Sequence, residues 1–171
     1  RAVDAAFDTS LEVRFASWQD DLRHIFREFR ATLRKHPNLA PLIGAQLIAN
    51  MGVNLDLVEA ILAALSRAGF RDQMLASAYN AVVAMLVGFT TQEFAQLPVE
   101  DLAGWQEQVR GRIETVDRAR YPTLGANLPP LANKVFILRW QNGVDNPLDA
   151  GFFFSVETLL AGLAAMAPQT S

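Results

Sequence analysis

The sequence contains no cysteine and only two histidines, and these absences remove several kinds of chemistry. Without cysteine there is no disulfide framework, no thiolate zinc site and no cysteine nucleophile. His24 and His36 do not combine with a second histidine or with paired carboxylates at a metal-ligand spacing. No glycine-rich loop follows a strand, and no serine is framed by glycines. We therefore expect no catalytic residue, no metal site and no cofactor, and a protein that is not an enzyme.

The chain also lacks an excess of basic residues. Its formal net charge is −3 and its pI is about 5.4, which argues against nucleic-acid binding as the main property of these 171 residues. No basic segment followed by an apolar run and a cleavage site stands near Arg1, so no secretion signal is indicated. We expect a cytoplasmic location. The length suits one domain with a sizeable core.

Two windows of twenty residues, His36–Leu55 and Gln73–Gln92, carry no formal charge. Their length alone would allow each to span a membrane. Amides such as those of Asn50 and Asn80 would be costly in lipid, so we expect buried helices of a bundle and no membrane partner. The carboxylates that follow, Glu93 among them, are spaced like surface groups.

No stretch alternates apolar and polar residues for long enough to indicate a strand, whereas helical spacing recurs along the chain. From Trp18 an apolar stripe alternates with a charged side that includes Arg27, Arg30 and Arg34, which we expect to lie outside. We predict an all-α bundle of seven to nine helices. The longer ones are expected from Trp18, Pro41, Asn54, Asp72 and Pro98, with a short amphipathic piece at Leu131–Trp140 between turn-rich segments and a last helix at Phe152–Ala167.

The last helix carries one charged residue, Glu157, and sorts into two faces at 100° per residue. Large residues form one broad stripe, and Ser155, Thr158, Gly162 and Ala165 form the opposite side. A helix that is apolar all round must be buried all round. The sequence leaves two arrangements open, a central helix in a monomer or a symmetric dimer that packs on the small residues.

Several polar residues lie inside otherwise apolar helices. A buried amide or phenol costs free energy unless it is hydrogen-bonded. Neighbouring helices would usually satisfy such groups, but together with apolar neighbours they would also suit the lining of a cavity. The residues concerned are Gln46, Asn50, Tyr79, Asn80 and Gln92, near Phe29, Met51, Leu65 and Met85.

Six segments, taken in order, resemble the C-terminal domain of tetracycline-repressor (TetR) family transcription regulators. They are SWQDDLRHIFREFRATLRKHP (17–37), SRAGF (66–70), VGFTTQE (87–93), YP (121–122), LPPLANKVF (128–136) and FFFSVETLLAGL (152–163). The resemblance covers nearly the whole chain, and the order and spacing of the segments make it more specific than any one of them.

This resemblance implies an effector-binding and dimerisation domain at 14–171, with 1–13 as the tail of a helix that connects it to an N-terminal DNA-binding domain. Operator DNA would be contacted only through that further domain. A small-molecule effector would shift the connecting helix and release the DNA. Two other functions stay open, a helical protein-interaction module with a filled core and a small helical enzyme that uses His36.

The resemblance also implies an intersubunit four-helix bundle built from Phe152–Ala167 and Leu102–Val116 and their copies in a homodimer. The interface residues it implies are Phe152, Ser155, Thr158, Leu159, Gly162, Leu163 and Ala165. Phe136 and Trp140 belong to a piece that would reach over the partner's pocket.

For the pocket, Phe29 matches an aromatic residue that lines the drug site of the tetracycline repressor. Ile25 and Ile43 stand where that repressor has a drug-binding asparagine and a metal-binding histidine, and Gln92 stands where it has a supporting glutamate. We therefore expect a more apolar effector than a magnesium–tetracycline chelate. The expected ligand-binding residues are Ile25, Phe29, Ile43, Gln46, Ile61, Leu65, Tyr79, Val83, Gln92 and Phe136.

Overall fold

The computed structural model describes residues 14–43, 54–98 and 100–168. The tail at 1–13 and the expected pocket residue Gln46 lie outside the described residues. Within them the chain forms helices and no strand, which confirms the all-α prediction. The elements are α2 (Trp18–Lys35), η2 (Pro37–Leu39), α4 (Leu55–Arg67), α5 (Asp72–Glu93), α6 (Leu102–Glu114), α7 (Pro122–Leu131) and α8 (Asp149–Met166), and residues 40–43 are also helical.

Helix α2 begins where its sequence predicts. The Ser17 hydroxyl accepts a hydrogen bond from the Asp20 N–H at 3.1 Å, which satisfies one of the open donors of the first turn. Helix α4 begins in the same way, with the Asn54 side chain accepting from the Leu57 N–H at 2.9 Å. Gly69, at φ +94°, then supplies the left-handed turn between α4 and α5.

One prediction about the middle of the chain is wrong. The segment around residues 123–130, expected to be turns, is helix α7, because Pro122 occupies the first turn, where a missing N–H costs nothing. The short amphipathic piece expected at Leu131–Trp140 begins with the last residue of α7 and continues as turns and bends. There Asn133 takes a positive φ of 58°, and its side-chain oxygen accepts hydrogen bonds from the Trp140 and Gln141 N–H groups.

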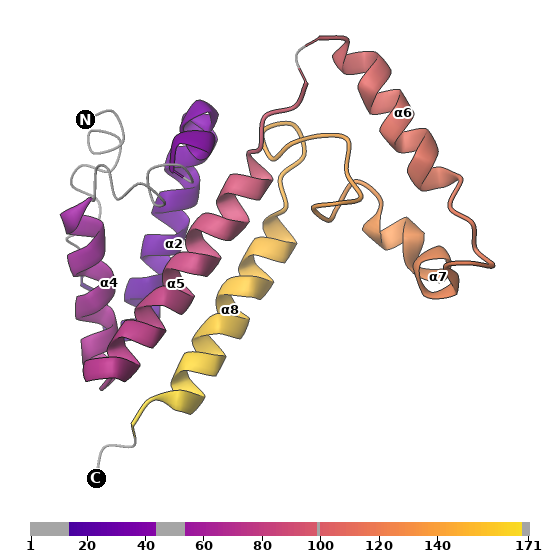
Figure 1. Cartoon of the computed structure of the whole chain (residues 1–171). Helices are drawn as coiled ribbons and strands as arrows, with labels where there is room; N and C mark the ends of the chain where they lie inside the picture. The colour runs from indigo at the N-terminus through magenta and orange to yellow at the C-terminus, as the bar shows by residue number, and fades with distance from the viewer. Residues whose placement is uncertain (1–13, 44–53, 99, 169–171) are drawn as a thin grey trace.

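Helices α2, α4, α5 and α8 pack side by side around one apolar core (Figure 1). Helices α5 and α8 are antiparallel neighbours, since Phe152 in the first turns of α8 meets Phe89 near the end of α5 with ring centroids 5.4 Å apart. At the other end Pro168 lies against Gly69, which precedes α5. The four helices therefore form the body of the protein.

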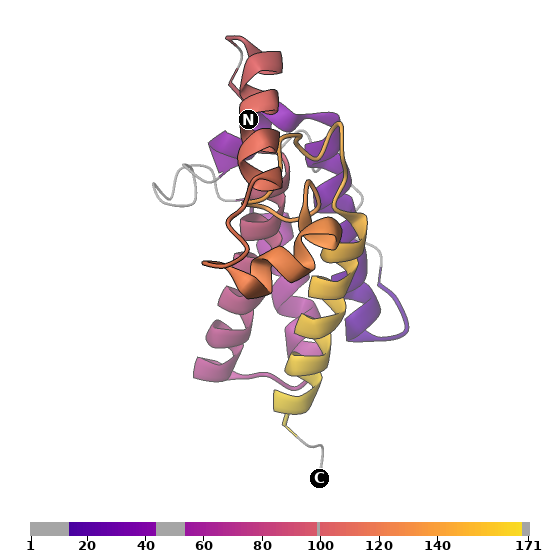
Figure 2. The same cartoon turned by 90° about the vertical axis from the view of Figure 1, so that its right-hand side faces the viewer.

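Helices α6 and α7 form an arm that stands away from this body. In Figure 1 the arm extends beyond α8, and in Figure 2, turned by 90°, it projects toward the viewer in front of α5 and α8. The helix beside α8 in the protomer is thus α5, whereas the segment expected to join α8 in a bundle, Leu102–Val116, lies in the arm.

The arm is tied to the body at Glu93, the last residue of α5. Its carboxylate is completely buried and accepts hydrogen bonds from Arg30 Nε at 2.7 Å and Nη2 at 2.5 Å. The same carboxylate accepts the Leu148 N–H at 2.8 Å, and the Glu93 carbonyl accepts the Gly143 N–H at 2.6 Å. Any side chain at position 143 would collide with Glu93, so this close approach requires glycine.

The expectation that Glu93 and Arg30 lie on the surface is wrong. Arg30 is 6% exposed and Glu93 is 0% exposed. Each is an ordinary polar residue in the helical pattern, and they are covered by distant parts of the chain: residues 143–148 lie against Glu93, and Asp149 and Phe152 lie against Arg30. Burying the pair is tolerated because every carboxylate oxygen of Glu93 is hydrogen-bonded.

We expect Arg30→Met to lower the free energy of unfolding by about 3–5 kcal/mol, because it leaves the Glu93 carboxylate buried without a cation. Chemical denaturation measures the loss. The matched control is Arg23→Met, which breaks the partly exposed pair with Glu157 and should cost about 0–1 kcal/mol. Equal losses in the two variants would show that leaving Glu93 buried without Arg30 carries no special penalty, which would contradict this prediction.

Candidate functional site

Five of the residues expected to bind a ligand lie together in the core of the body. Ile25 and Phe29 of α2 pack in one buried cluster with Ile61 and Leu65 of α4 and with Ile43. Helix α2 supplies its stripe at three- and four-residue steps, and α4 packs along it. The structure therefore brings these five apolar side chains to one place between α2, α4 and α5.

Tyr79 and Val83 of α5 are half-buried and pack against the same cluster. Burial raises the pKa of the Tyr79 phenol, so the group stays protonated and can donate a hydrogen bond at neutral pH. Among the described residues its hydroxyl makes no hydrogen bond. Tyr79 is thus a polar group at the border of an apolar cluster.

Gln92 and Phe136 lie away from this cluster. Gln92 is exposed, and its side-chain amide donates to the Gly88 carbonyl of its own helix at 3.2 Å. Phe136 follows α7 and meets Phe89 edge-to-face with ring centroids 4.9 Å apart. In the protomer Phe136 therefore packs at the base of the arm, beside the junction of α5 and α8.

Helix α8 has the two faces that its sequence indicates. Phe152, Val156, Leu160 and Leu163 point into the core, and a spacing of 100° per residue places all four on one stripe. Phe152 and Leu163, expected at a subunit interface, thus belong to the protomer's own core, at 1% and 5% exposed. The other expected interface residues are half-buried or exposed: Ser155, Thr158, Leu159, Gly162 and Ala165.

Helix α5 exposes small residues in the same way. A β-carbon added at Gly88 of α5 or at Gly162 of α8 would meet no atom within 4 Å, so both glycines border open space. Because α5 and α8 lie side by side, their outer residues form one surface, named here the small-residue face. It comprises Ser77, Ala81, Ala84 and Gly88 of α5 and Thr158, Gly162 and Ala165 of α8.

Helices α5 and α8 are also long and apolar enough to cross a membrane by length and composition alone. In the protein each turns one stripe into the shared core and leaves the opposite side to solvent. Phe154 of α8 is 75% exposed next to the small-residue face. The apolar character of both helices is therefore only partly accounted for by the packing of one protomer.

Sequence reasoning missed Arg139, which the return of the chain after the arm buries to 8% exposed. Its guanidinium donates to the Gln141 and Asn146 carbonyls, and its Nη1 has no partner among the described residues. Burial lowers the pKa of Arg139, and the negative charge of Glu93 opposes that effect. A single arginine in a turn-rich segment gives no sequence signal that its guanidinium will be buried against backbone carbonyls.

Comparison with known proteins gives two findings. A family model described as the tetracycline-repressor-like C-terminal domain matches residues 15–167. The structure is similar to that of the transcriptional regulator SCO7222, a TetR from Streptomyces coelicolor, with a TM-score of 0.71 and 20% identity, over 98% of this chain and 75% of that one. No sequence among the curated proteins compared matches the chain.

We expect Phe29→Ala to lower the free energy of unfolding by about 3–5 kcal/mol, because it empties a fully packed position in the cluster. Gln92→Ala, at an exposed position on α5, should change it by no more than about 0.5 kcal/mol. Denaturant titrations of the two variants provide the comparison. A large loss for Gln92→Ala would mean that this amide has a partner that the protomer does not reveal.

Proposed function

The chain belongs to the TetR family of transcription regulators, within its tetracycline-repressor-like C-terminal domains, and from that premise we propose that it senses an effector and dimerises. The observation that carries the proposal is the family match over 15–167 joined to the small-residue face. In this function the domain binds a small, largely apolar effector and thereby releases its parent protein from operator DNA.

The small-residue face supports a homodimer. Alanine, serine and glycine side chains let a second pair of helices approach closely, a steric argument that holds in any solvent. A two-fold axis would place α5 and α8 against their own copies in a four-helix bundle. Phe154 would then leave water, which is worth about 1.5–3 kcal/mol for a side chain of this kind.

The place of the arm supports the same assembly. Helices α6 and α7 project on the side where a partner would pack against α5 and α8 (Figure 2). Because the arm packs little against its own body, its apolar side chains would be buried by packing against the partner protomer. In the proposed dimer α5, not the helix at 102–116, is the companion of α8, and the arm of each protomer lies along its partner.

The buried cluster supports the effector site. Ile25, Phe29 and Leu65 provide an apolar wall, and the Tyr79 hydroxyl, which makes no hydrogen bond among the described residues, provides an orienting one. Gln92 does not belong to this site, because it points to solvent. Ile43, Ile61 and Val83 complete the wall, and Gln46 remains an expected contributor outside the described residues.

An effector bound between α2, α4 and α5 acts on DNA through the chain that precedes α2. The SCO7222 regulator is longer than the matched region, which accords with a parent protein that carries a further, DNA-binding domain. The connecting segment has one arrangement that binds DNA and one that does not. The effector releases DNA to the extent that its affinity is higher for the second arrangement than for the first. This function needs no enzymatic activity and places the protein in the cytoplasm.

A filled core favours a second candidate, a helical interaction module without an effector. Ile61 and Leu65 are completely buried and Phe29 is 3% exposed in the described protomer. If the bundle never opens around Phe29, the domain would act only through its surfaces. Ligand binding by the core separates the two functions.

We expect Gly162→Leu to weaken the dimer about tenfold or more, because overpacking at a closely packed surface costs about 1–3 kcal/mol. The protomer itself has open space at this position and should keep its fold. Light scattering coupled to size-exclusion chromatography at micromolar concentration gives the oligomeric state. Glu59→Leu adds the same side chain on the exposed side of α4 and should leave the dimer intact. A monomer in the unaltered protein refutes the proposed assembly.

Thermal-shift screening of apolar ligands tests the effector site. A ligand at one hundred times its Kd stabilises the native state by about 2.7 kcal/mol, a rise in Tm of about 5–10 °C for a domain of this size. Tyr79→Phe should reduce the shift for ligands that carry a hydrogen-bond acceptor, and Gln92→Ala should not. Failure of every ligand to raise Tm would favour the interaction module.

A further inference from the structure

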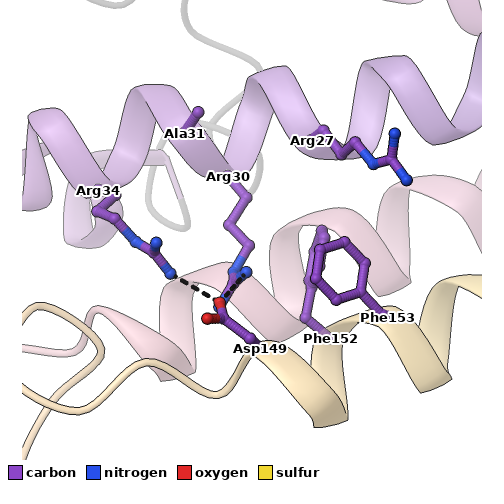
Figure 3. Close-up of a pocket in the computed structure, with 7 residues that line it drawn as sticks. All are labelled: Arg27, Arg30, Ala31, Arg34, Asp149, Phe152 and Phe153. Atoms are coloured by element: carbon purple, nitrogen blue, oxygen red, sulfur yellow. Dashed lines mark hydrogen bonds and ion pairs between the residues drawn. The ribbon is translucent and has the colours of Figure 1, made fainter.

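A surface hollow of about 310 Å³ lies between α2 and α8, apart from the buried cluster (Figure 3). Arg27, Arg30 and Arg34 line it from α2, and Asp149, Phe152 and Phe153 line it from α8. The three arginines recur at steps of three and four residues, so that one side of α2 directs all of them toward α8. Neither the predicted pocket nor the small-residue face explains this concentration of guanidinium groups.

The hollow carries more positive than negative charge. Arg30 Nη1 and Arg34 Nη2 both approach Oδ1 of Asp149, at 2.7 and 3.0 Å, and the rest of the Arg30 guanidinium binds Glu93. Arg27 forms no ion pair in the part of the chain that the structure describes. The charges of Asp20 and Glu157 act on Arg27 from a distance, so Arg27 is the guanidinium of the hollow that no carboxylate binds directly among the described residues.

The Arg30–Arg34 pair already holds a carboxylate. Partial burial raises the pKa of Asp149, but hydrogen bonds from Arg30 and Arg34 outweigh this effect and hold its pKa below the ordinary value. Asp149 is thus ionised at neutral pH, and its side chain is 56% exposed to solvent. An exposed carboxylate between two arginines can be replaced by another one.

The floor of the hollow is aromatic. Phe153 is 44% exposed, and its ring meets that of buried Phe152 edge-to-face at 5.6 Å between centroids. The guanidinium of Arg27 lies 5.8 Å from the centre of the Phe153 ring, and that of Arg30 lies 4.5 Å from the centre of the Phe152 ring. A planar apolar group on Phe153 would cover exposed ring surface beside the guanidinium of Arg27.

We propose that the α2–α8 hollow binds a small organic carboxylate that carries a planar apolar ring. Its carboxylate binds the flat fork of Arg34 in the place that Asp149 now occupies, and its ring packs on Phe153 beside the guanidinium of Arg27. The volume suits a ligand of one or two rings, since sites for drug-sized molecules begin near roughly 300 Å³. An uncharged apolar partner fits less well, because it would strip water from Arg27 and Arg34 without pairing them.

The hollow remains accessible when a partner covers the small-residue face. Phe153 and Gly162 are nine residues apart on α8, and at 100° per residue they lie on opposite sides of the helix, about 180° apart. A ligand in the hollow is therefore distinct both from a subunit contact and from an effector in the core.

Isothermal titration with 2-naphthoate at neutral pH tests this site on the unaltered chain. We expect saturable binding up to millimolar concentration, and much weaker binding of 2-naphthalenemethanol, which has the same ring system and no charge. Inorganic phosphate, an anion without a ring, should compete only weakly. Equal binding of the naphthoate and the alcohol would show that the arginines take no part and would overturn the proposal.

Variants locate the ligand. Arg34→Gln should weaken 2-naphthoate binding about tenfold, the usual effect of losing a charge-assisted hydrogen bond. Arg27→Gln should also weaken it, because the bound ring loses the cation beside Phe153. Asp149→Asn should strengthen it, because it removes the carboxylate that competes for Arg30 and Arg34. Arg71→Gln is the matched control, since this exposed arginine, far from the hollow, donates to the backbone carbonyls of Ser66 and Phe70 and forms no ion pair among the described residues. Melting curves confirm that each variant is folded. Arg27→Gln breaks no ion pair among the described residues and keeps the test valid even if Arg34→Gln is unstable.

Unchanged affinity in Arg27→Gln and Arg34→Gln, or weaker binding in Asp149→Asn, overturns the proposal. Loss of binding in Tyr79→Phe with no effect of the arginine variants would place the naphthoate in the core instead, which also overturns it. Absence of saturable binding to the unaltered protein does the same.

Discussion

The buried ion pair between Arg30 and Glu93 is the interaction on which the rest of the structure depends. It joins the middle of α2 to the end of α5, and through the Leu148 N–H it also fixes the start of α8. Three helices of the body thus meet at one carboxylate. A buried pair is a poor source of net stability, but it discriminates strongly against arrangements that leave either charge alone. That discrimination sets the position at which the arm leaves the body and returns to it.

The sequence was sufficient for the elements whose signals are local. The caps at Ser17 and Asn54 and the left-handed Gly69 follow from side-chain chemistry within four residues, and the structure has all three. The two-faced character of the last helix follows from helical spacing alone. These signals sufficed for an all-α fold and for the apolar cluster around Phe29, because both follow from the spacing of apolar residues within single helices.

What could not be predicted depends on chain segments far apart in the sequence. Glu93 fits a surface pattern until residues 143–148 return to cover it, and Arg30 fits the outer side of α2 until Glu93 is placed. Gln92 immediately precedes Glu93 but points to solvent, because successive residues of a helix are turned by 100° and can lie on opposite sides of the boundary between core and solvent. The order of α5 and α8 in space likewise required the path of the arm, which no local pattern contains.

The hydrogen bonds of Glu93 to positions 143 and 148 close the intervening chain into a loop whose two ends are held by one residue. Lengthening such a loop costs little, since the closure entropy grows only with the logarithm of its length. Insertions and deletions inside the arm are therefore far cheaper than any change at its anchor, where glycine alone fits. The length and sequence of the arm can therefore change while the four-helix body stays constant.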